Sequence, residues 1–230
     1  MEQANGINTW NETALHAALK RWYARPGDQL EIEVDGYIID IVRDELLVEI
    51  QTANFTSLKS KLPQLLQKHQ VRLVHPIAYE KWIVKLPKAG AAKASRRKSP
   101  KRGRVEHLFY ELVRIPHLLS HPDFSLEVLL TQEEEVRRFD GTTGWRRKGW
   151  VVTERRLLQV LERHLFTTPA DLAALIPATL EEPFTTADLA KALGRRRPVG
   201  QKMAYCLRKL KVVSPVGKAG RSILYRRSSA

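Results

Sequence analysis

Two acidic side chains and one amide, Asp40, Glu49 and Gln51, lie among the apolar runs of the stretch YIIDIVRDELLVEIQ at residues 37–51. Runs rich in Ile, Val and Leu flank the polar pair Asp44–Glu45, so the stretch predicts a β-hairpin with a two-residue turn. That turn sets the register and places Asp40 directly opposite Glu49. Because side chains alternate along a strand, Asp40, Glu49 and Gln51 are expected on one face of the hairpin.

Opposed carboxylates in an apolar setting need a counter-charge. The Cβ atoms of directly opposed residues lie about 5 Å apart, where like charges destabilise the pair, and an unpartnered buried charge is costly. Mg²⁺ takes hard oxygen ligands, commonly one or two carboxylates with water and substrate phosphate. We therefore predict a metal site that uses Asp40 and Glu49. The alternative is a pair of solvated carboxylates at a sheet edge, with no ligand.

The elements around this hairpin can be read from hydrophobic spacing. After the hairpin, apolar residues recur at helical spacing before the next strand begins. A crossover helix at this point implies that residues 71–77 return parallel to the hairpin. The expected elements are a helix at 9–24, a strand at 29–34, a helix from about residue 53 and strands at 71–77 and 80–86.

This order of elements, with the pattern D-x8-E-x-Q across residues 40–51, resembles the PD-(D/E)xK nuclease superfamily. The resemblance covers roughly residues 9–86 and implies a restriction-endonuclease-like fold, an α/β mixed sheet core flanked by helices. In that superfamily an Asp on one core strand and an E-x-K motif on the next bind Mg²⁺ and activate water. Asp40 and Glu49 match the metal-binding acids.

The resemblance also assigns roles to neighbouring residues. Glu12 is placed like the first-helix Glu that many members add to the site, and the Ile50 carbonyl is a further metal ligand. Gln51 stands where the motif usually has Lys, so it would orient water by hydrogen bonding. Lys59 or Lys61, on the following helix, is a candidate for the missing cation. The implied cofactor is Mg²⁺ or Mn²⁺.

Charge is distributed unevenly along the 230 residues, which carry a formal net charge of +14. Residues 88–104 contain eight Lys and Arg and no acid, and residues 184–230 contain twelve against one acid. Basic blocks of this kind indicate a polyanionic partner, most often nucleic acid. With few apolar residues to bury, 88–104 is predicted to be a flexible basic linker, which either contacts phosphate or simply tethers its neighbours.

The C-terminal part shows a second resemblance. Residues 187–193 and 199–213 have helical spacing, and a basic hairpin tipped by GKAG follows, so the segment resembles a winged helix-turn-helix domain. Such domains place their second helix in the major groove of DNA, although some winged helices bind protein. The expected DNA-binding residues are Arg195, Arg196, Arg197, Gln201, Lys202, Tyr205, Arg208, Lys209, Lys218 and Arg221.

Four segments are therefore expected: a nuclease-like domain at 1–87, the linker at 88–104, an irregular α/β insert of unassigned role at 105–153, and a winged helix domain at 154–230 that opens with a helix at 154–166. The predicted function is a metal-dependent DNA endonuclease positioned by the winged helix. The alternative is a DNA-binding regulator or architectural protein that does not cut.

Other features bound the setting of this activity. The single Cys206 allows no intramolecular disulfide and fits a reducing compartment. No apolar run of about 18 residues is present, and the N-terminus has no signal-peptide pattern, so we expect a cytoplasmic protein with no membrane partner. Cutting both DNA strands would need two copies, which leaves a homodimer open, as well as protein partners in a larger DNA-processing assembly.

Overall fold

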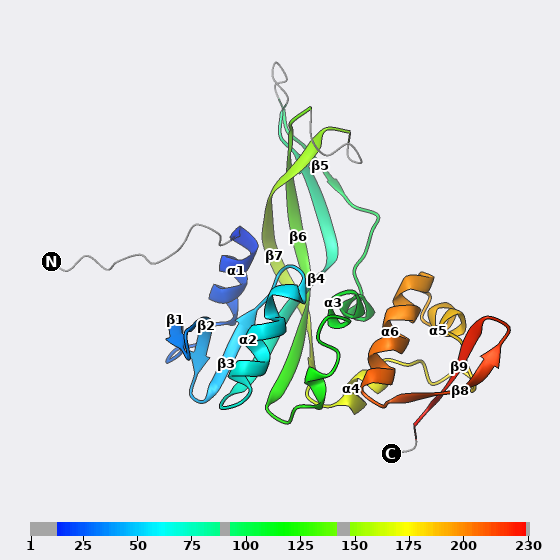
Figure 1. Cartoon of the computed structure of the whole chain (residues 1–230). Coiled ribbons are helices and arrows are strands. Elements are labelled where there is room, and N and C mark those ends of the chain that lie inside the picture. Colours follow the sequence, from blue (N-terminus) through cyan, green and yellow to red (C-terminus); the bar gives the residue numbers. More distant parts are fainter. Residues whose placement is uncertain (1–12, 88–92, 142–147, 229–230) are drawn as a thin grey trace.

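A seven-stranded mixed sheet forms the centre of the molecule (Figure 1). The computed structural model describes residues 13–87, 93–141 and 148–228. The strands of the sheet are β1 (Gln29–Val34), β2 (Tyr37–Arg43), β3 (Leu46–Ile50), β4 (Gln70–Lys85), β5 (Ser95–Lys98), β6 (Phe124–Phe139) and β7 (Trp150–Phe166). Their order is β1-β2-β3-β4-β6-β7, with β5 paired to β4. β3, β4 and β6 run parallel, and the remaining pairs are antiparallel.

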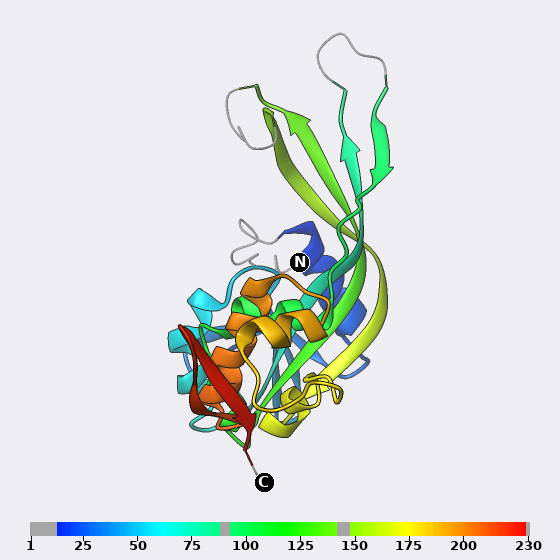
Figure 2. The same ribbon diagram turned by 90° about the vertical axis from the view of Figure 1, so that its right-hand side faces the viewer.

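Helices flank this sheet and form a separate group beside it (Figures 1 and 2). The α-helices are α1 (Ala14–Tyr23), α2 (Leu58–Leu65), α3 (Phe109–Leu112), α4 (Pro169–Ala173), α5 (Thr186–Ala192) and α6 (Arg197–Lys209). A two-stranded hairpin, β8 (Val213–Ala219) and β9 (Ser222–Arg227), follows α6. Short 3₁₀ turns at Phe55–Ser57, Val105–Leu108 and Leu118–Ser120 precede or follow these helices.

The sequence correctly predicted the β2–β3 hairpin and the helical crossover that follows it. The two-residue turn after β2 sets Arg43 opposite Leu46 and Ile41 opposite Val48. β4 returns parallel to β3 after the α2 crossover, as expected. The fold is therefore a mixed α/β sheet flanked by helices.

Neighbouring residues on the central strands belong to two different hydrophobic cores, because side chains alternate across the sheet. Leu47 and Leu73 pack into the core that contains the α2 leucines, whereas Val48 and Val74 pack into the core that contains Leu15 of α1. α1 and α2 therefore cover opposite faces of the sheet. The larger core, on the α2 face, continues into α3 and α6.

Several predicted boundaries were wrong. Residues 154–166 form part of strand β7 rather than a helix, because they pair along almost the full length of β6. One strand, β4, replaces the two strands expected between residues 71 and 86. The expected linker contains β5, which pairs with the C-terminal part of β4. One sheet thus runs from residue 29 to residue 166, across the expected divisions at 87 and 153.

The long strands β4, β6 and β7, together with β5, extend beyond the helices as an arm (Figure 2), in which β4 stays paired with β6 as far as Lys85. The C-terminal helices and the β8–β9 hairpin lie on the side of the sheet away from β1 (Figure 1). None of the helices in the described ranges is long and apolar enough to cross a lipid bilayer.

Candidate functional site

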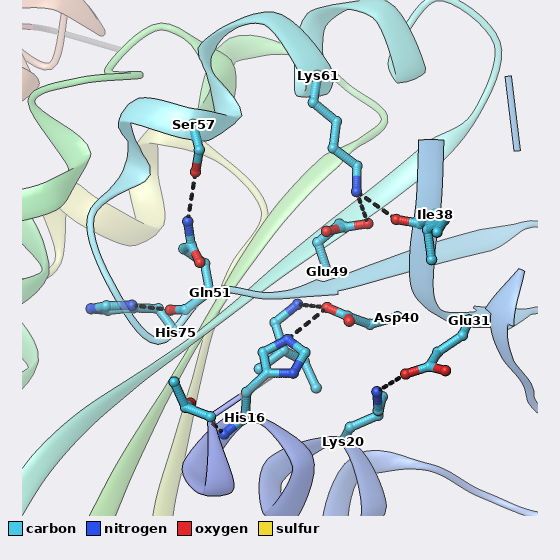
Figure 3. Close-up of polar contacts among 12 residues, drawn as sticks. His16, Lys20, Glu31, Ile38, Asp40, Glu49, Gln51, Ser57, Lys61 and His75 are labelled. Atoms are coloured by element: carbon cyan, nitrogen blue, oxygen red, sulfur yellow. Dashed lines mark hydrogen bonds and ion pairs between the residues drawn. The ribbon is translucent and has the colours of Figure 1, made fainter. Parts of the chain in front are cut away.

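The ladder between β2 and β3 ends at the Ile41–Val48 pair, beside the predicted catalytic acids. Just beyond that pair, Asp40 Oδ2 accepts a hydrogen bond of 2.8 Å from the backbone N–H of Ile50 (Figure 3). A side chain of β2 has thus replaced a backbone carbonyl as the partner of β3. We call this end of the hairpin, formed by Ile38, Asp40, Glu49 and Ile50, the ladder end.

Asp40 and Glu49 do not form the opposed, one-face pair that the hairpin register predicted. The Asp40 carboxylate contacts His16 of α1, and the Glu49 carboxylate contacts Lys61 of α2 on the other face of the sheet (Figure 3). The reason is the hydrogen bond from Ile50, which stands in for the regular ladder that would have set Asp40 opposite Glu49. The two carboxylates are therefore contacted by helices on opposite faces of the sheet, yet they lie close enough for the Asp40 charge to raise the pKa of Glu49.

Lys61 joins the two strands at the ladder end from the α2 side. Its Nζ lies 2.6 Å from Glu49 Oε1 and donates a hydrogen bond of 2.8 Å to the Ile38 carbonyl oxygen. Lys59, the other candidate cation, is exposed and makes no contact with either carboxylate among the described residues. Of the two lysines, Lys61 alone carries positive charge to the ladder end.

Burial dominates the electrostatics of Glu49, whose side chain is 9% exposed. Loss of hydration raises the pKa of Glu49 to about 7, against an opposing effect of Lys61, and the nearby Asp40 charge raises it further. The carboxylate of Glu49 is therefore protonated in part at neutral pH. Additional positive charge at the ladder end would favour its ionised form.

His16 holds the other carboxylate. Its Nε2 lies 3.2 Å from Asp40 Oδ2, and both side chains are mostly buried. Thr13 caps the start of α1 by accepting a hydrogen bond from the His16 backbone N–H, which fixes the first turn beside the sheet. The helix-borne acid expected at this site, Glu12, lies outside the described residues.

Gln51 turns its amide away from Glu49. Its Nε2 donates to the Asn54 carbonyl and to Ser57 Oγ, each at 2.9 Å, within the loop that leads to α2 (Figure 3). The Gln51 carbonyl accepts from Nδ1 of His75 at 2.6 Å. Burial lowers the pKa of His75 to about 4, so a neutral imidazole donates this bond at pH 7. The hydrogen bonds of Gln51 and His75 together fix the chain where it leaves β3.

Asp40 and Glu49 are the residues of the ladder end that could hold an oxygen-preferring cation. Asp40 Oδ1 and Glu49 Oε2 have no protein hydrogen-bond donor among the described residues, whereas the second oxygen of each acid is engaged. Mg²⁺ is commonly held by one or two carboxylates, with water completing its shell. The described ranges contain no group of three or more His, Cys, Asp or Glu side chains that could hold a metal ion together. Any ion here would thus depend on the Asp40 and Glu49 carboxylates and on solvent. The predicted third ligand, the Ile50 carbonyl, belongs to the residue whose N–H donates to Asp40.

The predicted DNA-binding helix has one exposed face. Gln201, Tyr205, Arg208 and Lys209 are exposed and recur at helical spacing along α6. Val199, Met203 and Leu207 are buried on the opposite face, as their spacing predicted. Arg196 and Arg197 are exposed at the start of the helix, and Lys218 and Arg221 are exposed on the β8–β9 hairpin.

Two of the predicted DNA-binding residues face the body of the protein instead. Lys202 is half-buried, with its Nζ 5.8 Å from the ring centre of Tyr110 in α3. Arg195 Nε lies 3.8 Å from Glu106 Oε2, just before α3. The reason is that α6 packs against α3 within the larger hydrophobic core. Arg195 and Lys202 therefore help to hold α6 against α3 and the turn that precedes it.

A family model described as a domain of unknown function, DUF8091, matches residues 13–167. The chain therefore belongs to the DUF8091 family. It is also 34% identical over 225 residues to an uncharacterized protein of Treponema pallidum (strain Nichols), a match that covers 96% of this chain and 87% of that protein. No solved structure matches the chain.

The DUF8091 match coincides with the sheet. It begins at Thr13, the N-cap of α1, and ends at Thr167, directly after β7. The DUF8091 region thus contains the ladder end and the whole arm, and excludes α4, α5, α6 and the β8–β9 hairpin. This extent agrees with the single sheet rather than with the predicted divisions at residues 87 and 153.

Two residues that contact the predicted site residues were not themselves predicted. His16 follows Glu12 by four positions, so helical spacing in the predicted helix at 9–24 could have identified it. His75 lies inside a strand and had no such signal. Its hydrogen bond to the backbone carbonyl of Gln51 depends on the parallel pairing that brings β4 beside β3.

Proposed function

We propose that this protein is a metal-dependent DNA endonuclease whose active site is the ladder end. The observation that carries the proposal is the position of Lys61, whose Nζ lies 2.6 Å from Glu49 Oε1. A lysine from α2 thereby supplies the positive charge that Gln51 lacks at the third position of the motif. Two acids and one lysine within a hairpin of a mixed sheet are the groups that the resemblance to PD-(D/E)xK nucleases requires.

The residues would share the work of phosphodiester hydrolysis. Asp40 and Glu49 would hold Mg²⁺ or Mn²⁺, which when bound stabilises charge on the phosphate and makes water a better nucleophile. Lys61 would favour the ionised form of Glu49 and add positive charge beside the phosphate that is attacked. His16 would fix the Asp40 carboxylate in place. In the reaction, a water oxygen bonds to phosphorus and one phosphorus–oxygen bond to a sugar breaks.

The C-terminal part would bring DNA to this site. The exposed face of α6, with Gln201, Tyr205, Arg208 and Lys209, has the polar and basic character of a recognition helix. Helix α5, helix α6 and the β8–β9 hairpin follow one another in the order found in winged helix-turn-helix domains. The excess of basic residues in 184–230 supports a phosphate-bearing partner.

A second function, DNA binding without cutting, has a specific observation in its favour. The amide of Gln51 is engaged by Asn54 and Ser57, so it does not point to where a water would lie beside Glu49. In that case Lys61 serves as the permanent counter-ion of Glu49, and the ladder end is structural. The protein would then act as a DNA-binding regulator or architectural protein.

The experiment that separates these functions is cleavage of supercoiled plasmid DNA by the full chain with Mg²⁺, Mn²⁺ or EDTA. The comparison is the Asp40→Ala/Glu49→Ala double variant, checked for folding by its melting temperature in EDTA. Metal-dependent cutting that the double variant lacks is the result expected for a nuclease.

Cutting that persists in the double variant would place the activity elsewhere or in a contaminant, and would reject the ladder end as the site. If neither protein cuts any DNA form, while both bind DNA with equal salt dependence, the regulator function replaces the nuclease. DNA binding by the folded double variant is the control, because it shows that a loss of cutting is not caused by a loss of DNA binding.

A further inference from the structure

Two cavities adjoin along the segment that links β5 to α3. The first, of about 590 Å³, lies against β4, β5 and β6. The second, of about 540 Å³, lies against the start of α6. Lys101, Arg102 and His107 line both cavities, so the two form one continuous surface. We call this surface the basic groove.

Cationic side chains dominate the lining of the basic groove. The first cavity is lined by Lys81, Arg97, Lys101, Arg102 and Arg137, against one carboxylate, that of Glu135. The second cavity adds Arg195 and Arg196, and none of its lining residues is acidic. The groove therefore carries a large positive excess, spread over both cavities rather than focused at one point.

Internal ion pairs cancel only part of this charge. Glu135 is engaged by Lys81 at 2.9 Å and by Arg137, and Arg102 lies 3.1 Å from Glu80. Three cations of the groove are exposed and have no ion-pair partner among the described residues. These three are Arg97, Lys101 and Arg196. They are placed along the groove, one in the first cavity, one shared and one in the second.

The groove is built on a fixed backbone. The Ser99 N–H donates to the Lys81 carbonyl at 2.7 Å, and the Gly103 N–H donates to the Ala78 carbonyl at 2.9 Å. The chain approaches β4 so closely that a Cβ at Gly103 would lie 2.4 Å from the Ala78 carbonyl oxygen. The segment is thus held against β4 before any ligand arrives, which lowers the entropic cost of binding.

We propose that the basic groove binds the sugar–phosphate backbone of DNA, an inference that rests on the DNA partner of the proposed function. Separated cations that lack ion-pair partners match an anion with evenly repeated charges, whereas a small anion would be bound by converging ones. Arginine and lysine side chains make most phosphate contacts in protein–DNA complexes. The groove also continues to Arg196, at the start of the helix whose exposed face is expected to meet DNA.

The test compares two double variants of the full chain that lose the same charge. Arg97→Gln/Lys101→Gln removes two groove cations that have no ion-pair partner. Arg21→Gln/Arg25→Gln removes two exposed cations at and just after the end of α1, far from the groove (Figure 1). Binding of a fluorescent DNA duplex is measured by anisotropy in EDTA, over a range of salt concentrations, so that cutting plays no part.

The groove variant is expected to bind at least about tenfold more weakly at 0.1 M salt. Its plot of log affinity against log salt concentration is expected to have a slope shallower by about 1.8, because two phosphate contacts are lost and each contributes about 0.9 to the slope. The α1 variant is expected to match the wild-type chain. Melting temperatures of both variants establish that the difference is not one of folding.

Two results would reject the basic groove as a DNA-binding surface without rejecting DNA binding by the protein. One is equal affinity and slope in the two variants. The other is a poly-glutamate peptide that binds more tightly than the duplex and loses affinity only in the groove variant, which would assign the groove to an acidic protein. Absence of DNA binding by the wild-type chain would instead reject the DNA partner on which both proposals depend.

Discussion

Lys61 Nζ lies 2.6 Å from Glu49 Oε1 and 2.8 Å from the carbonyl oxygen of Ile38. One lysine of α2 therefore bridges β2 and β3 where their ladder has ended, and it does so beside the most buried acid of the site. This relationship makes the proposed function testable, because Lys59, two residues away on the same helix, offers a matched control.

Lys61→Met is expected to reduce metal-dependent DNA cutting by about 100-fold or more, a typical loss for a group that stabilises charge during the reaction. Lys59→Met is expected to cut at the wild-type rate, because Lys59 is exposed and does not reach the ladder end. Single-turnover plasmid nicking measures both. Equal rates in the two variants would mean that Lys61 does not take the place of the missing motif lysine.

Asp40→Asn should preserve the fold while removing the metal ligand, because the Asn side-chain oxygen can still accept the hydrogen bond from the Ile50 N–H. We expect a melting temperature in EDTA close to that of the wild-type chain. Mg²⁺ at about 100 times its dissociation constant would stabilise the wild-type chain by about 2.7 kcal/mol, and the variant by far less. Thermal melts with and without Mg²⁺ measure this. Equal stabilisation of both proteins would remove Asp40 from the metal site.

Glu49 predicts a pH dependence with a definite sign. Its pKa in the folded protein is about 7, above its ordinary value of 4.5, so the folded state holds the proton more tightly than the unfolded state. This group therefore lowers the free energy of unfolding as pH rises from about 4.5 to 7, by on the order of 3 kcal/mol. Glu49→Gln should abolish that dependence in EDTA, as measured by urea unfolding at several pH values.

Mg²⁺ should act on the same group. Because a bound cation favours ionised Glu49, the increase in melting temperature with Mg²⁺ is expected to be larger at pH 8 than at pH 6. In Glu49→Gln the increase should be small and independent of pH. A pH-independent increase in the wild-type chain would show that the ion binds elsewhere.

His75 is expected to change the free energy of unfolding with pH in the opposite direction, over an overlapping range of pH. Burial lowers its pKa to about 4 from an ordinary 6.5, so the unfolded state takes up the proton first as pH falls. The folded protein loses on the order of 3 kcal/mol from this group as pH falls from 6.5 to 4. His75→Asn, whose amide can still donate to the Gln51 carbonyl, should remove that loss.

The two effects oppose each other between pH 4.5 and 6.5, so the wild-type curve alone is not diagnostic there. The measurement is the difference in unfolding free energy between His75→Asn and the wild-type chain at each pH. A difference that does not change across this range would contradict a buried neutral His75.

Gly200 sets the contact between α5 and α6. A Cβ at this position would lie 2.3 Å from the Thr186 carbonyl oxygen, so Gly200→Ala must push the two helices apart. We expect a destabilisation of about 1–3 kcal/mol, the usual cost of overpacking. Gly217→Ala is the control, because a Cβ there meets no atom within 4 Å. Chemical denaturation measures both, and equal stability of the two variants would contradict this close approach.

The sequence pattern was sufficient to predict those features that short-range interactions decide. The two-residue turn at Asp44–Glu45 determined the hairpin register, because side chains repeat every two residues and a slip would expose the apolar set. Helical spacing identified the buried face of α6 in the same way. The parallel return of β4 followed from the length of the α2 crossover.

Residues 154–166 show where local pattern failed. Their leucines recur at helical spacing, yet the segment is the strand β7, and Leu158 and Leu165 are each 46% exposed. The deciding interactions are non-local. Arg155 pairs with the fully buried Glu133 of β6, and Arg163 pairs with the buried Glu127 of the same strand. Backbone pairing with β6 and these neutralised acids outweigh the local preference for a helix.

The sequence alone predicted the candidate residues of the ladder end: Asp40, Glu49 and a lysine from the next helix. Only the tertiary structure decided that Lys61 rather than Lys59 contacts Glu49, and that His16 contacts Asp40. The physical reason is that each of these facts depends on where separate elements pack. Turn type and side-chain alternation act within a hairpin, whereas contacts to α1 and α2 arise only when those helices cover the two faces of the sheet.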